Sequence, residues 1–152
     1  MTDYAHAEYL ENLNRELALA IGNAIWAFAQ IEWAVTITLG RGGSNLDHIL
    51  SELPFRQRTT VLKRILPELG LYPETIEELG ACLNQFERLS EKRNLIAHNP
   101  WKIWLDSEAK EIMTEIQHYS RQNKKLDLSA LKEFSNDCAE ALKRFEAAAV
   151  AL

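Results

Sequence analysis

The sequence has little of what marks several classes of small protein. Its 152 residues include only two cysteines, Cys82 and Cys138, and no Cys or His spacing typical of a zinc site, so we expect two reduced thiols. It also lacks an excess of positive charge, because 17 basic residues face 22 acidic ones and the formal net charge is −5. Proteins that coat nucleic acid are usually basic, so any such contact here must use a local patch.

No basic segment leads into an apolar run at the N-terminus, so no signal peptide is expected. Residues 17–39 are apolar over a length that could span a membrane, but Asn23, Gln30 and Glu32 interrupt them and basic flanks are missing. We therefore expect a cytoplasmic protein with no membrane contact. With 47% apolar residues and no linker, residues 1–152 are expected to form a single helical domain.

Apolar residues recur every three or four positions from about Ala5 to Leu39, which predicts a first long helix. A second apolar set, Trp26, Trp33 and Ile37, widens the apolar face of this helix. A helix that is apolar on most sides lies at the centre of a bundle or is covered by a second subunit. Glu32, the one charge in its apolar stretch, either faces water or pairs with a cation.

A short helical turn and the helix that starts near Pro54 follow, and then a third long helix is expected from Pro73 to His98, where Pro100 ends it. Residues 121–125 are expected to form a polar turn, and Ser129 to cap a last helix. The predicted fold class is all-α, an antiparallel bundle of four to five helices. The helix that starts near Pro54 should present a basic outer face, formed by Arg56, Arg58, Lys63 and Arg64.

The segment from Trp101 to Tyr119 fits two structures. Ile112, Thr114 and Ile116 alternate as in a strand, whereas Ile112, Met113 and Ile116 also fit one face of a helix. Either a short β-hairpin that turns at residues 106–109 follows the long helix, or a loop and a further helix do.

The end of the helix predicted at residues 73–98 carries an Arg, an Asn and a His within six residues. His98 can take or give a proton near neutral pH, because imidazole titrates in that range. Arg93 stays charged, and its planar fork fits a phosphate. On an unbroken helix Arg93 and His98 lie about 140° apart, whereas Asn94 and His98 share a face.

The run Lys92-Arg93-Asn94-Leu95-Ile96-Ala97-His98 resembles the signature of the HEPN superfamily, in which Arg, a polar residue, an apolar stretch and His follow one another. Residues 29–33, Ala-Gln-Ile-Glu-Trp, resemble an element of small bacterial HEPN proteins. The resemblance implies a metal-independent endoribonuclease that works as a dimer, and many such proteins are toxins or antiviral defence effectors. Some members have lost catalysis and serve as binding modules for a protein or nucleotide partner.

For this chain, the resemblance implies RNA cleavage by attack of the ribose 2′-hydroxyl, with Arg93 and His98 as catalytic residues and with no metal or cofactor. Asn94 would orient His98 or the phosphate, and Glu32 would hold Arg93 or Asn94. Because one chain supplies one His to this motif, a homodimer would supply the second. Further RNA contacts are expected from Arg88, Lys92, Trp101 and Lys102.

An antitoxin or regulatory protein is a further partner that the resemblance implies. Some HEPN toxins carry a Tyr two residues after the His, and a partner enzyme modifies that Tyr. In this chain the position is Pro100, which argues against that form of regulation.

Overall fold

The computed structural model describes residues 3–41, 47–106, 111–118, 120–121 and 124–152, without the side chains of residues 3–6, 47–49, 105 and 111. The chain is mainly helical over these residues. The helices are α1 (Asp3–Arg41), α2 (Asp47–Glu52), α3 (Phe55–Ile65), a short 3-10 helix (Leu66–Glu68), α4 (Pro73–His98) and α5 (Leu128–Ala149). Three strands form one antiparallel sheet in the order β1 (Trp101–Asp106), β2 (Glu111–Gln117) and β3 (Lys125–Asp127).

The helix predicted at residues 73–98 is confirmed, since α4 begins at Pro73 and ends at His98. Residues 101–106 and 111–117 form the two strands of the expected hairpin and not a helix, with Trp101 opposite Ile116. Residues 107–109 of the expected turn lie outside the described residues.

Two expectations about the segment before α5 are wrong. Lys125, expected to be the last residue of the polar turn, instead pairs with Gln117 of β2 as the first residue of the third strand. The N-cap of α5 is Asp127 and not Ser129, because the Asp127 side chain accepts a hydrogen bond of 2.7 Å from the Ala130 backbone N–H.

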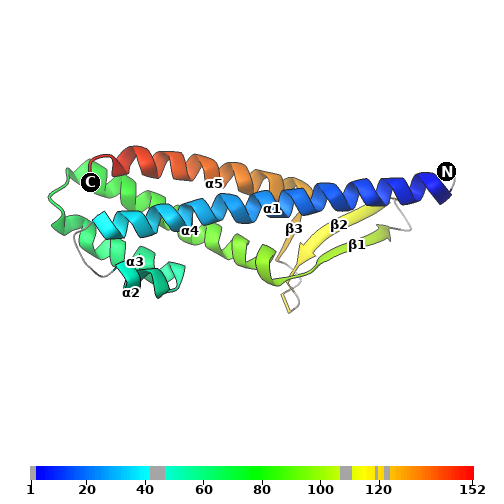
Figure 1. Ribbon diagram of the computed structural model, residues 1–152, viewed down its shortest axis with the longest axis horizontal. Helices are drawn as coiled ribbons and strands as arrows, with labels where there is room; N and C mark the ends of the chain where they lie inside the picture. The colour runs from blue at the N-terminus through cyan, green and yellow to red at the C-terminus, as the bar shows by residue number, and fades with distance from the viewer. Residues whose placement is uncertain (1–2, 42–46, 107–110, 119, 122–123) are drawn as a thin grey trace.

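The three long helices α1, α4 and α5 lie side by side, and α4 runs opposite to the other two (Figure 1). Ion pairs show the directions: Arg144 and Asp137 of α5 contact Glu78 and Lys92 of α4, in reversed order. Helices α1 and α5 therefore run parallel to each other, because both run opposite to α4. The sheet lies beside the end of the trio where α4 stops and α5 starts (Figure 1).

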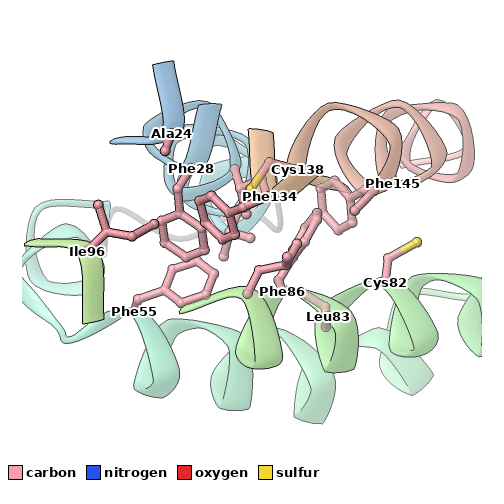
Figure 2. Close-up of a cluster of buried hydrophobic side chains, with 14 of the residues drawn as sticks. Ala24, Phe28, Phe55, Cys82, Leu83, Phe86, Ile96, Phe134, Cys138 and Phe145 are labelled. Atoms are coloured by element: carbon pink, nitrogen blue, oxygen red, sulfur yellow. The ribbon is translucent and has the colours of Figure 1, made fainter. Parts of the chain in front are cut away.

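One hydrophobic core joins α1, α3, α4, α5 and the sheet. Figure 2 shows Phe28 of α1 lying between Phe55 of α3 and Phe134 of α5, with ring centroids 5.1 and 6.5 Å away. Burying each of these rings contributes roughly 1.5–3 kcal/mol. Both cysteines are free and buried, and burial raises the pKa of the Cys138 thiol to about 12.

The opposite face of α1 stays exposed in the single chain. Leu19, Trp26 and Trp33, spaced by seven residues, are 65%, 69% and 67% exposed, and Ile37 continues the same stripe. By length and composition alone, α1 could cross a membrane from Ala7 to Arg41. Its inner face packs on α4 and α5.

Candidate functional site

The end of α4 is fixed by a proline and an asparagine. Asn99, which precedes Pro100, adopts an extended conformation with φ −126° and ψ 140°. Its side-chain amide donates a hydrogen bond of 2.9 Å to the Leu95 carbonyl, one of the carbonyls that a helix end leaves without an N–H partner. His98 is thus the last helical residue, and its side chain is exposed.

Arg93 points away from this end, toward α1. Its Nη2 donates to Glu32 Oε1 at 2.5 Å, and its guanidinium lies 5.1 Å from the centre of the Phe28 ring. The contact agrees with the expectation that Glu32 pairs with Arg93. About a quarter of each side chain remains exposed (25% and 28%), so the pair is partly screened by water.

Glu32 has a second cation beside it. Arg58 Nη2 lies 4.0 Å from Glu32 Oε1, and Arg58 Nη1 donates to Thr36 Oγ1 at 2.7 Å. The Arg58 side chain is only 13% exposed, so the expectation that it belongs to an outer basic face is wrong. These ion pairs of Glu32 with Arg58 and Arg93 join α1, α3 and α4. Arg93 of the motif therefore stabilises the packing of these helices.

A cavity of about 330 Å³, named here the Arg93 cavity, opens between the start of α3 and α4. It is lined by Arg56, Glu87, Arg93 and Asn94, among others. Burial acts to raise the pKa of Glu87, but hydrogen bonds from Lys63 Nζ and Thr59 Oγ1, both 2.7 Å, and the charges of Lys63 and Arg56 outweigh it and lower the pKa. Glu87 is therefore a paired anion that joins α3 to α4.

A second cavity of about 360 Å³, named here the His98 cavity, lies between the end of α4 and the segment after β2. Arg93 and His98 thus open into different cavities, as their separation around the helix predicts, while Asn94 lines both. The lining of the His98 cavity combines imidazole, amide, carboxylate and cationic groups: Glu91, Asn94, Leu95, His98, Asn99, His118, Arg121 and Lys124.

The hairpin carries His118 back to α4. Strand β1 leaves α4 after only two residues, and Trp101 pairs with Ile116, so the register brings His118, two residues beyond Ile116, back toward Asn99. The backbone N–H of His118 donates to the Lys124 carbonyl at 3.0 Å. His118 was not among the expected site residues, because only the hairpin register places it here.

Comparisons with models of known protein families, with curated proteins and with solved structures returned no match for this chain. Within the described part of the chain, no three His, Cys, Asp or Glu side chains are grouped to hold a metal ion.

The four residues expected to contact RNA line neither cavity. Lys92 Nζ lies 3.9 Å from Asp137 on α5, and Lys102 Nζ donates to Gln117 on the neighbouring strand at 2.9 Å. Trp101 packs partly buried against the core, so it is not displayed for stacking on a base. Arg88 is exposed on α4. Of the expected site residues, only Asn94 and His98 meet in the His98 cavity.

Proposed function

We propose that this protein is a metal-independent endoribonuclease built on a helical bundle of HEPN type, with its reaction centre in the His98 cavity. The observation that carries the proposal is the lining of that cavity. An exposed imidazole at the end of α4 shares it with an amide, Asn94, one turn earlier, and with two cations, Arg121 and Lys124. These are the groups that phosphodiester cleavage without a metal requires.

In the proposed reaction, neutral His98 takes the proton of a ribose 2′-hydroxyl. The 2′-oxygen forms a bond to phosphorus, the bond from phosphorus to the 5′-oxygen breaks, and the leaving oxygen takes a proton from water or from the imidazolium. The products are a 2′,3′-cyclic phosphate and a 5′-hydroxyl. Arg121 and Lys124 stabilise the charge that builds on the phosphate oxygens, and Glu91 stabilises the imidazolium.

The role of Arg93 in this proposal differs from the one that the resemblance implies. Its bond to Glu32 and its position over Phe28 make it a positioning residue that holds α4 against α1. The same contacts favour a second candidate function, a catalytically inactive module that binds RNA or a nucleotide in the His98 cavity. Such a module would need the cations of the cavity but not a proton acceptor.

We also propose that two copies associate through the exposed stripe of α1. The seven-residue spacing of Leu19, Trp26 and Trp33 is the spacing at which two helices interlock. From Leu19 to Ile37 the stripe extends about 27 Å along the helix. A cytoplasmic toxin or defence effector held in check by an antitoxin or other regulatory protein is the biological setting that the resemblance implies.

The test is cleavage of a labelled single-stranded RNA of mixed sequence in the presence of EDTA. We expect the wild type to cleave it, and to leave a DNA of the same sequence intact because DNA lacks the 2′-hydroxyl. His98→Ala should abolish cleavage, while Lys143→Ala, an exposed change on α5, should not affect it. RNA that is bound but not cleaved by the wild type would favour the binding module.

A further inference from the structure

The exposed stripe of α1 alternates between large and small residues. Gly22 and Ala29 lie exposed between Leu19, Trp26 and Trp33, and the spacings of three and four residues place all five on one face of the helix. We infer that two copies pack their α1 helices antiparallel through this face, with Trp33 of each copy over the partner's Gly22. The inference rests on the association of two copies proposed above, and it does not depend on RNA cleavage.

Gly22 is a glycine for which the single chain gives no steric reason. Its backbone is helical, and an added Cβ atom would meet no atom of the described chain within 4 Å. Glycine inside an exposed helix costs about 1 kcal/mol relative to alanine. Glycine does, however, let another chain approach the helix backbone closely, and the large side chains on either side of Gly22 are the ones left exposed.

The order of large and small residues selects the direction of pairing. In a parallel pair with two-fold symmetry, each residue faces its own copy, so tryptophan would meet tryptophan and glycine would meet glycine. In one antiparallel register, Trp33 faces the partner's Gly22 and Trp26 faces the partner's Ala29. Each tryptophan then fills the space above a small residue, as side chains fill the holes between paired helices.

The area of the stripe agrees with a second copy as the partner. Trp26 and Trp33 are each about two-thirds exposed, so the four tryptophans of a dimer would bury roughly 600 Å². Leu19, Ile37 and the polar residues beside them add to this area, toward the roughly 1,200 Å² at which stable interfaces begin. Because the stripe is complementary to itself, a second copy covers it.

This pairing keeps the two His98 cavities apart. The core residues of α1, such as Phe28, face α4 and α5, and the stripe lies on the opposite face of the helix. The His98 cavity is lined from α4 and the segment after β2, so both α1 helices lie between the two cavities. Packed helices lie 8–10 Å apart, which separates the cavities by on the order of 20 Å or more. Each copy therefore acts with its own His98, in contrast to the shared site that the motif implies.

Crosslinking tests the direction and register of the pair. In the double variant Gly22→Cys, Trp33→Cys, a short bismaleimide should join two copies, because position 33 faces the partner's position 22. Neither single variant should be joined, because each new cysteine would lie about 16 Å along the helix from its own copy. Cys82 and Cys138 are buried, so the wild type is the control that should not be joined. Crosslinking of both single variants, or none in the double variant, would overturn the inference.

Filling the space above Gly22 tests the close approach of the partner. Gly22→Leu should raise the dissociation constant of the dimer about tenfold or more in analytical ultracentrifugation, because the added side chain overpacks the place of the partner's Trp33. Ala147→Leu, at an exposed small residue of α5, should leave it unchanged. Thermal unfolding checks that both variants fold. A dimer equally tight in Gly22→Leu and the wild type would contradict the pairing.

Mixing wild type with an excess of His98→Ala tests the separation of the two cavities. Cleavage of RNA per wild-type chain should stay the same, because each chain holds its own site. A fall in cleavage would show a shared site and overturn this arrangement. A wild type that does not cleave RNA would overturn only the nuclease, since crosslinking reports the pairing independently.

Discussion

At the residue scale, Arg93 and His98 belong to one sequence motif but lie in different surroundings. Arg93 is bound to Glu32 and lies over Phe28, while His98 faces a different cavity. The separation follows from five residues of helix, which turn the two side chains about 140° apart. A cation beside Glu32 was one of two alternatives that the sequence left open, because an acid at the border of an apolar stripe either faces water or needs a cation. The second partner, Arg58, was not predicted, since the sequence does not fix where α3 packs.

Loss of the Arg93 side chain should destabilise the fold. We expect Arg93→Ala to lower the free energy of unfolding by about 1–3 kcal/mol, because Glu32 is left half-buried with only the more distant Arg58. Arg93→Lys should lower the free energy of unfolding by a smaller amount, since Lys keeps the charge but not the planar fork. Urea unfolding measures both.

The matched control is Lys92→Ala, one residue earlier on α4. Its side chain is half exposed and its ion pair with Asp137 is long, so the change should stay within about 0.5 kcal/mol of the wild type. An Arg93→Ala variant as stable as this control would show that the contact with Glu32 contributes nothing to the fold.

At the element scale, the sequence predicted the long helices. It offered the hairpin of β1 and β2 as one of two alternatives, and it did not predict β3. The apolar spacing and the two prolines predicted where α4 begins and ends. The segment after it fitted strand and helix equally, because Ile112 and Ile116 satisfy both periods. Strand β3 is three residues long and polar at both ends, so no pattern marks it. His118 reaches the site only through the register of these strands, which explains why sequence spacing alone did not single it out.

The attachment of α3 to α4 should depend on pH. The folded pKa of Glu87 lies below its ordinary value of 4.5, so its contribution to stability is present above that pH and is lost as pH falls through the folded pKa. We expect Glu87→Gln to cost about 1 kcal/mol at neutral pH and much less at a pH below the folded pKa of Glu87. Urea unfolding at both pH values measures the difference.

Glu133→Gln on α5 is the control, because this exposed carboxylate makes no contact among those described between α3 and α4. Its effect should not change between the two pH values. A Glu87→Gln penalty that is the same at both would contradict the pairing of Glu87 with Lys63 and Thr59.

At the scale of the whole molecule, α1 has one face in the core and one face in water. The apolar content of this helix predicted either a central position or cover by a second subunit, and a single chain provides the cover on one side only. The sequence could not decide between a central position and cover by a second subunit, because both faces of the helix carry large apolar residues. Only the packing shows that Trp26 and Trp33 point outward.

If a second copy covers this stripe, charge placed in it should separate the copies. We expect the wild type to be a dimer in light scattering, and the double variant Trp26→Glu, Trp33→Glu to be a folded monomer, because two buried acids would face each other across the interface. Tyr72→Glu, at an equally exposed aromatic residue before α4, should leave the dimer intact. A monomeric wild type would contradict the proposed dimer.

RNA cleavage in the His98 cavity is the central proposal for this protein. The most direct measurement follows the ends produced when wild type and His98→Ala act on the same labelled RNA in EDTA. We expect 2′,3′-cyclic phosphate and 5′-hydroxyl ends from the wild type and no product from the variant, with equal thermal stability of the two proteins. Equal cleavage by both proteins, or none by the wild type, would contradict the proposal.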